Sequence, residues 1–330
     1  MKNKIFFKKE NFFLIAEAGN NHEGSIKKAK KLISEAAKAG ADAIKFQAFD
    51  VEEFYRKNSN KDRFDQLRKF QLNRKQYLQL SKFAKKNKIV FFATPFDLDI
   101  AKYLNKIQPI FKIASGDNNF FDLIKKVLGF GKPLIVSTGL LNFGQITKLN
   151  KFLIKNKKNN EIVLMHCVSI YPTPLKYINL ESILFLKEKF KKVIVGYSDH
   201  SKGIKACIYA AVLGARVIEK HFTLNKNQSS FRDHKISANP KELKMLVNSL
   251  HEVVKIRGYF EKKPSKEEMK NAYLMRRSAV ANKNLIKNHK LKENDISFLR
   301  DPKKKRKYGF TTFIGKKLKK SVNKSKDIIF

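Results

Sequence analysis

Eight short apolar runs recur along residues 12–223, and each is separated from the next by a stretch with the periodicity of an amphipathic helix. Apolar runs of this length are typical of strands buried on both faces, and their alternation with helices indicates a parallel sheet covered by helices. The expected strands are residues 12–19, 41–47, 89–96, 110–116, 133–139, 162–169, 193–200 and 216–223. This alternation restricts the fold to the α/β class.

The segments between the runs carry helix signals of their own. Residues 25–39 begin with Ser25, a good N-cap residue, and apolar side chains recur along one stripe, as they do in 74–86 and 240–256. Eight strand–helix units over about 250 residues predict a (β/α)8 TIM barrel. The alternative is a doubly wound open sheet, but its Gly-x-Gly-x-x-Gly turn is missing, because Gly19 and Gly24 lie too far apart.

The last part of the chain has a different character. From about Arg276 onward, short apolar segments alternate with lysine-rich turns, which indicates a small β-rich domain. We therefore expect a barrel over residues 1–262, a linker over 263–275 and a small domain over 276–330. A domain of this size is marginally stable alone, so it should pack on the barrel or on a second subunit.

The charge balance constrains the partners. The chain has 71 basic and 29 acidic residues, a formal charge of +42, which raises the alternative of a basic nucleic-acid-binding protein on a barrel scaffold. However, the excess is mostly lysine at polar helix positions, and joint enrichment in Lys, Asn, Ile and Phe is typical of an AT-rich genome. We expect no nucleic-acid partner and a positive field that attracts small anionic substrates.

Localisation is predicted from cysteine usage and from the N-terminus. Cys167 and Cys207 lie in apolar stretches and suggest no disulfide framework, which favours a reducing compartment. The apolar run 12–16 is too short for a signal peptide or a membrane span. We expect a cytoplasmic protein without a membrane partner.

Every expected strand ends in reactive or anion-binding side chains. In a barrel these ends meet on one face, where active sites are built. The residues concerned are Glu17, Lys45, Gln47, Thr94, Lys112, Ser115, Ser137, Thr138, Ser169, Tyr171, Ser198, Asp199, His200, Glu219 and His221.

Two histidines in this set end consecutive strands. Neighbouring strands lie about 4.8 Å apart, so His200 and His221 could share one metal ion, with Asp199 and Glu219 as carboxylates that orient the imidazoles. Nitrogen ligands with open positions suit Mn²⁺, Zn²⁺ or Fe²⁺ acting as a Lewis acid on a carbonyl group. No Cys-x-x-Cys or His-Glu-x-x-His pattern is present, so a structural zinc site is not expected.

Two lysines emerge from strands that are otherwise apolar. Lys45 and Lys112 would lose hydration energy there unless an anion paired with them. With the hydroxyls of Thr94, Ser115 and Ser137 they could form a cradle for a phosphate and a carboxylate. A Schiff-base lysine of a metal-free pyruvate aldolase is the alternative, and the residues alone leave both readings open.

Several motifs together resemble the N-acetylneuraminate (sialic acid) synthase family, which includes legionaminate and pseudaminate synthases. The resemblance runs in order over nearly the entire chain. Its motifs are IAEAGNNHEG (15–24), GADAIKFQ (40–47), KIASG (112–116), STG (137–139), HC (166–167), YPTP (171–174), GYSDH (196–200) and EKHF (219–222).

This resemblance implies a barrel followed by an antifreeze-like (SAF) domain, swapped onto the partner in a homodimer. The implied reaction joins phosphoenolpyruvate to N-acetylmannosamine or a related 2,4-diacetamido-6-deoxy aldose and releases phosphate. His200 and His221 would hold a divalent metal, foremost Mn²⁺, with Mg²⁺ or Co²⁺ as alternatives, and Glu17 would lie beside the reacting atoms. The implied phosphoenolpyruvate-binding residues are Lys45, Thr94, Lys112, Ser115, Ser137 and Ser198, and the implied sugar-binding residues are Gln47, Tyr171, Asp233 and Arg300.

The chain departs from the family pattern in three places. Ser169 stands where relatives often have Asn, and Ser230-Phe231-Arg232 replaces a Gly-Pro run just before Asp233. In the small domain, Arg300 is followed by Asp301-Pro302 instead of Pro-Gly, although it is the best candidate to reach the partner's active site. The retained Asp-His-Lys run at 233–235 favours a neuraminate- or legionaminate-type sugar over a pseudaminate-type one.

Overall fold

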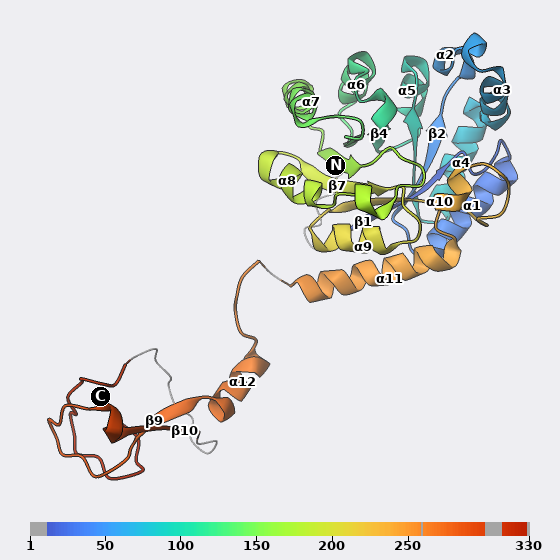
Figure 1. The fold of residues 1–330 in the computed structure, drawn as a ribbon. Coiled ribbons are helices and arrows are strands. Elements are labelled where there is room, and N and C mark those ends of the chain that lie inside the picture. Colours follow the sequence, from blue (N-terminus) through green and yellow to red (C-terminus); the bar gives the residue numbers. More distant parts are fainter. Residues whose placement is uncertain (1–11, 259, 301–311, 329–330) are drawn as a thin grey trace. The chain divides into compact units, whose positions relative to one another are not determined.

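The computed structural model describes residues 12–258, 260–300 and 312–328 (Figure 1). The chain separates into two compact units, Met1–Gly258 and Tyr259–Phe330, and each is described here by itself. Leu299 and Arg300 lie within the described residues, whereas Asp301 and Pro302 lie outside them. No helix in the described part of the chain is long and apolar enough to cross a membrane.

The first unit is built from eight parallel strands with helices between them (Figure 1). The strands are β1 (Phe13–Gly19), β2 (Ala43–Ala48), β3 (Val90–Pro95), β4 (Phe111–Ile113), β5 (Leu134–Ser137), β6 (Ile162–Cys167), β7 (Ile194–Asp199) and β8 (Val217–His221). The helices are α1 (Ile26–Ala39), α2 (Val51–Phe54), α3 (Lys61–Phe70), α4 (Arg74–Lys86), α5 (Leu98–Leu104), α6 (Phe121–Leu128), α7 (Phe143–Asn156), α8 (Glu181–Lys189), α9 (Lys205–Val212), α10 (Asp233–Ile236) and α11 (Pro240–Arg257).

The sheet curves into a near-closed barrel, so the predicted TIM-barrel fold is confirmed. The strand order is β3-β2-β1-β8-β7-β6-β5-β4, and the two end strands, β3 and β4, lie against each other. Seven of the eight strands fall within the predicted segments, and β2 ends at Ala48, one residue beyond its predicted segment. The largest difference is β4, which ends at Ile113 because Ser115–Asp117 turn into a short 3-10 helix.

Local capping explains why the helices begin where they do. The Ser25 hydroxyl accepts a hydrogen bond from the backbone N–H of Lys28 at 3.3 Å, as predicted for the start of α1. The helices α4, α7 and α11 each begin with an Asn N-cap in a reciprocal capping box. These caps satisfy backbone donors that would otherwise lack partners at the helix starts.

The barrel has two apolar layers. An outer layer fills the space between strands and helices, and an inner layer plugs the barrel interior with Ile15, Ala43, Phe92, Ile110, Ile135, Val163, Met165 and Val217. Successive side chains of a strand point to opposite faces, so the residue two positions after each plug residue also points inward. Several of those next inward positions are polar, as in Glu17 after Ile15, Lys45 after Ala43 and Glu219 after Val217, whereas Met165 after Val163 belongs to the plug itself.

The second unit contains a helix and a small sheet. Helix α12 (Lys266–Met275) lies within residues 263–275, which were expected to be a linker. Strands β9 (Arg277–Ala281) and β10 (Ile296–Arg300) pair antiparallel around a small apolar cluster that includes Leu285, Leu291 and Leu318. The unit contains strands as predicted, and its likeness to an antifreeze-like domain stays a prediction.

Candidate active site

Four buried charged side chains meet inside the barrel above the apolar plug. Lys45 Nζ lies 2.8 Å from Glu17 Oε2 and 3.7 Å from Glu219 Oε2. Lys112 Nζ donates to both carboxylate oxygens of Glu219, at 3.0 and 2.9 Å. None of the four residues is more than 5% exposed. Both lysines thus pair with carboxylates of the protein itself, and their predicted contact with a phosphate or carboxylate ligand stays a prediction.

The two carboxylates of this cluster differ in acidity. Burial raises the pKa of Glu17 to about 7 against the opposing attraction of Lys45. Burial also disfavours the charged form of Glu219, but Lys112 and Lys45 outweigh it and lower the pKa of that carboxyl to about 2. Glu219 therefore stays ionised near neutral pH, while Glu17 can gain or lose a proton there. When Glu17 is protonated, the cluster has a surplus positive charge that can pair with a bound anion.

Two of the predicted anion-binding hydroxyls, those of Thr94 and Ser198, contact the cluster. Lys45 Nζ donates to Thr94 Oγ1 at 3.4 Å, and the Ser198 hydroxyl donates to Glu219 Oε1 at 2.9 Å. Ser115 Oγ lies 3.0 Å from Cys167 Sγ. Asn118 Nδ2 donates to the carbonyl oxygens of Ser137 and Gly139, which fixes the end of β5.

Gly139 allows two serine hydroxyls to approach its backbone closely. A Cβ atom at this position would lie 2.6 Å from Ser115 Oγ, 2.6 Å from Ser169 Oγ and 3.0 Å from Cys167 Sγ. The Ser169 hydroxyl is buried and has no hydrogen-bond partner among the described residues. An unpaired buried hydroxyl is costly, so this hydroxyl suits a ligand with polar oxygens.

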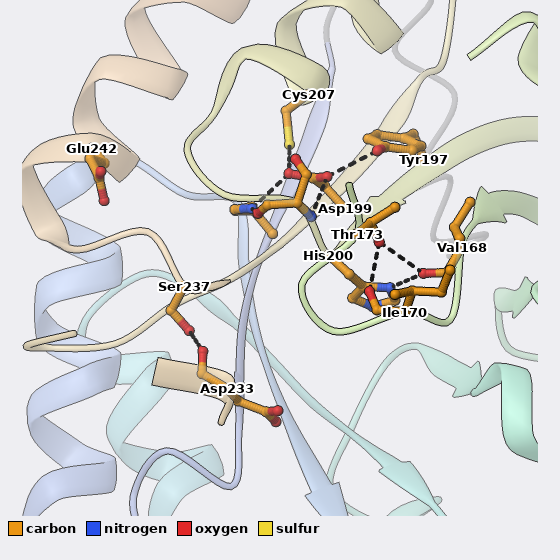
Figure 2. A network of polar contacts seen from close by, with 12 residues as sticks. Val168, Ile170, Thr173, Tyr197, Asp199, His200, Cys207, Asp233, Ser237 and Glu242 are labelled. Carbon is orange, nitrogen blue, oxygen red and sulfur yellow. Dashed lines mark hydrogen bonds and ion pairs between the residues drawn. The ribbon is translucent and has the colours of Figure 1, made fainter. Parts of the chain in front are cut away.

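The histidine pair lies on the same face, at the ends of β7 and β8. The imidazole ring centroids of His200 and His221 are 5.4 Å apart. His200 Nδ1 lies 2.7 Å from the carbonyl oxygen of Val168, to which it donates, so that the Nε2 lone pair stays available (Figure 2). His221 Nδ1 is buried and has no hydrogen-bond partner in the described part of the chain.

Both imidazoles are held in their neutral, ligand-competent form. Burial lowers the pKa of His200 to about 4, and it lowers the pKa of His221 well below the ordinary value with help from the neighbouring His200. Two neutral nitrogens with free lone pairs fit a divalent metal that keeps open positions. Within the described residues, no group of three or more His, Cys, Asp or Glu side chains forms a complete metal cage.

One expectation about the histidines is corrected. Asp199 and Glu219 were expected to orient the imidazoles directly. Instead, a backbone carbonyl holds His200, Glu219 pairs with Lys112, and Asp199 points to the other side of β7. The alternation of side chains along a strand explains this, because Asp199 adjoins His200 in sequence and so faces the opposite way.

The predicted sugar-binding residues are only partly brought together. The ring centroids of Tyr171 and His200 are 4.2 Å apart, and Asp233 Oδ2 lies 4.0 Å from His221 Nδ1. Arg232 packs over the Tyr171 ring at 5.0 Å, with its Nε 3.4 Å from Asp233 Oδ1.

The other two predicted sugar-binding residues lie elsewhere. Gln47 Oε1 accepts from Asn20 Nδ2 at 2.7 Å, on the Glu17 side of the barrel. Arg300 lies on β10 in the second unit, so its predicted contact with an active site stays a prediction. Sequence reasoning missed Asn118 as an anchor of β5, since it stands in no marked pattern, and it missed Cys167 as a partner of Ser115, although the HC motif at 166–167 contains this residue.

Comparisons with known proteins agree with this architecture. The NeuB family profile matches residues 32–262. The chain is 39% identical to the N,N'-diacetyllegionaminic acid synthase of Campylobacter jejuni, with 92% of this chain and 94% of that protein covered. It is 34% identical to the pseudaminic acid synthase of the same species, with 94% and 93% covered. A solved structure with 38% identity is the N-acetylneuraminic acid (sialic acid) synthetase of Leptospira borgpetersenii in complex with citrate, which has a TM-score of 0.75 and covers 79% of this chain and 90% of that one. The chain therefore belongs to the NeuB family.

Proposed function

We propose that the protein is a carbon–carbon bond-forming transferase that condenses phosphoenolpyruvate with an amino-sugar aldehyde. The products would be a nonulosonic (sialic) acid and phosphate. The observation that carries the proposal is one barrel face with a buried lysine pair beside a pair of neutral histidines. The first pair suits an anionic substrate and the second suits activation of a carbonyl group. The synthase names of the relatives support the same substrate class.

The anionic substrate would occupy the lysine side of the site. Lys45 and Lys112 would pair with its phosphate and carboxylate, and Thr94, Ser115, Ser137 and Ser198 would donate hydrogen bonds to the same oxygens. Because these lysines are already held by Glu17 and Glu219, the cradle is preorganised before the substrate arrives. The Ser115 and Ser169 hydroxyls beside Gly139 would hydrogen-bond to the ligand oxygens.

Glu17 would act as the general base of the reaction. C3 of phosphoenolpyruvate attacks the aldehyde carbon, the new C–C bond forms, and water adds at C2 before the C2–O bond to phosphate breaks. With a pKa of about 7, the Glu17 carboxylate can accept the proton that this water loses. The aldehyde oxygen gains a proton and becomes a hydroxyl, so the reaction consumes one water and releases one phosphate.

The histidines would bind a divalent metal, foremost Mn²⁺, with Mg²⁺ or Co²⁺ as alternatives. When bound, the metal supplies Lewis-acid polarisation of the sugar aldehyde. Tyr171 and Asp233 are close enough to these histidines to contact the same sugar, and Gln47 would reach it from β2. The somewhat higher identity to the legionaminic acid synthase favours a neuraminate- or legionaminate-type precursor over a pseudaminate-type one.

The small domain is proposed to act across a dimer. Its antifreeze-like character and a swapped homodimer rest on the family resemblance, whereas a cytoplasmic location rests on the cysteine usage and the N-terminal sequence. In such a dimer Arg300 would complete the active site of the other subunit. Mixing His221→Ala with Arg300→Ala protein would then restore turnover, because each mixed dimer has one intact site. Persistent inactivity of mixtures that do form dimers would contradict this arrangement.

The decisive experiment is a phosphate-release assay. It uses phosphoenolpyruvate, a panel of 2-acetamido and 2,4-diacetamido aldoses, and metal-free protein with or without Mn²⁺. We expect turnover with one sugar class only, dependence on the added metal, and its loss in His221→Ala with the circular dichroism spectrum unchanged. Undiminished activity after complete chelation would refute the metal-assisted reaction.

The Schiff-base aldolase remains the competing candidate, because burial lowers the pKa of Lys112 and so favours a nucleophilic amine. Borohydride reduction in the presence of pyruvate separates the two. We expect no covalent adduct with the wild-type protein. An adduct on Lys45 or Lys112, found by mass spectrometry, would support the aldolase.

A further inference from the structure

A fully buried ion pair is formed by the two residues that precede the histidines in sequence, and Figure 2 shows one of them, Asp199, next to His200. Lys220 Nζ is 2.7 Å from Asp199 Oδ2, and both side chains are completely inaccessible to solvent. Asp199 precedes His200 on β7, and Lys220 precedes His221 on β8. The two residues are register partners across the β7–β8 ladder, so the ion pair joins the strands one residue before each imidazole.

This pair faces away from the barrel interior. The Tyr197 hydroxyl donates to Asp199 Oδ1 at 2.9 Å, and the Cys207 thiol on α9 lies 3.7 Å from Asp199 Oδ2. Tyr197 and Cys207 both belong to the apolar layer between strands and helices. Asp199 and Lys220 therefore occupy that layer, and the histidines that follow them point toward the site.

The hydrogen bonds of the pair extend to the chain that follows His200. The backbone N–H of Ser201 donates to Asp199 Oδ1 at 3.0 Å, and Lys220 Nζ donates to the Ser201 carbonyl oxygen at 2.5 Å. Asp199 and Ser201 thus hold the backbone on both sides of His200. The Thr173 N–H adds a bond to the carbonyl oxygen of His200 itself, at 3.0 Å.

A buried ion pair is an expensive way to fill this layer. Removing two charges from water costs several kcal/mol per ion, and apolar side chains of similar volume are often equally or more stabilising. The neighbouring positions of the layer are filled by apolar residues such as Ile218 and Ala210. What apolar side chains cannot supply is a directional link between β7, β8 and the backbone around His200.

We infer that the Asp199–Lys220 pair is a positioning device that sets the distance between the two imidazoles, so that both nitrogens reach one divalent ion. The inference rests on the proposed function, because it concerns the metal site proposed there. Asp199 and Lys220 are positioning residues, since they contact neither the substrate nor the metal. Their effect should appear in metal affinity, separately from any effect on stability.

The test separates positioning from stability with a double variant. Asp199→Asn and Lys220→Met each leave one buried charge unpaired, so both should unfold at lower urea concentration than the wild-type protein. The double variant has no unpaired charge and should regain most of that stability. Asn160→Ala is the matched control, because Asn160 is a buried side chain with two backbone hydrogen bonds just before β6, at the opposite end of the barrel.

Metal affinity is measured on metal-free full-length protein by the loss of the free Mn²⁺ electron paramagnetic resonance signal. We expect Mn²⁺ to bind the double variant about 10- to 100-fold more weakly than the wild type, as is typical when a group that orients a ligand is lost. Asn160→Ala should be less stable than the wild type and bind Mn²⁺ normally. If the double variant is stable and binds Mn²⁺ with wild-type affinity, the inference is overturned while the proposed metal site stands. If Mn²⁺ binding to the wild type were insensitive to His221→Ala, the proposed metal site and the inference would fall together.

Discussion

The close approach of two serine hydroxyls to Gly139 leads to a sharp prediction about substrate binding. In Gly139→Ala, the added Cβ would lie 2.6 Å from both Ser115 Oγ and Ser169 Oγ. Ordinary contact begins near 3.4 Å, so each hydroxyl would have to move by about 0.8 Å. Gly139 is not among the residues with positive φ, so alanine fits the backbone and only the contacts are perturbed.

The size of the effect follows from the hydrogen bonds at stake. A hydrogen bond to a charged group contributes about 1.5–3 kcal/mol, and 1.4 kcal/mol corresponds to a factor of ten. Displacing one serine from a phosphoenolpyruvate oxygen should therefore lower kcat/KM for phosphoenolpyruvate about 10- to 100-fold. Overpacking of this kind costs about 1–3 kcal/mol of folding free energy, which leaves the barrel folded. The KM for the sugar should stay close to the wild-type value.

Gly144→Ala is the matched control for this prediction. Gly144 lies on α7, and a Cβ there would come no closer than 3.5 Å to its nearest neighbour, Asn142 Oδ1. Continuous phosphate-release assays at varied phosphoenolpyruvate and fixed sugar would compare the two variants and the wild type. If Gly139→Ala matched Gly144→Ala in kcat/KM for phosphoenolpyruvate, the assignment of these two hydroxyls to the anionic substrate would be wrong.

Three further predictions concern charged residues of the same face. Because Glu17 has a pKa of about 7 and must be ionised to accept a proton, kcat/KM for phosphoenolpyruvate should rise with pH through about 7. In Glu17→Gln, the pH profile of kcat/KM should lose this ionisation and keep only that of the substrate phosphate, near pH 6. A pH profile identical to that of the wild type would exclude Glu17 as the base. Lys112→Met leaves Glu219 with a more distant cation, so urea unfolding should show a loss of about 3 kcal/mol, with partial recovery in Lys112→Met/Glu219→Gln. Equal stability of the single variant and the wild type would contradict this reading. Arg232→Ala removes a cation that lowers the pKa of the buried Asp233. The KM for the sugar should therefore rise about tenfold, while the KM for phosphoenolpyruvate is unchanged. Steady-state kinetics with each substrate varied in turn would show whether the two KM values separate.

Much of the fold could be predicted because its signals are local. Apolar runs mark the strands, and Ser25 and the Asn caps mark helix starts. Helix α12 was missed because the sequence around its start is mostly polar. The same kind of cap is nevertheless present, since Ser265 accepts a hydrogen bond from the N–H of Glu268.

The sequence predicted which residues lie on the site's face of the barrel, but not which of their side chains pair with one another. That His200 and His221 are neighbours follows from strand order alone. The bond between Lys112 on β4 and Glu219 on β8 depends on how side chains from non-adjacent strands meet across the barrel interior. That arrangement is set by the stagger and tilt of all eight strands, which no single segment encodes.

The apolar plug has a consequence for how such a protein can change during evolution. Most strands place an apolar plug residue such as Ile15 or Phe92 at a lower inward position and a polar residue at the next inward position above it. Some of these upper positions hold the buried Lys112–Glu219 pair, so substitutions there are costly to stability. Under the proposed function, a change of substrate at little risk to stability is therefore expected in the loops beyond the strand ends, which leave the plug untouched.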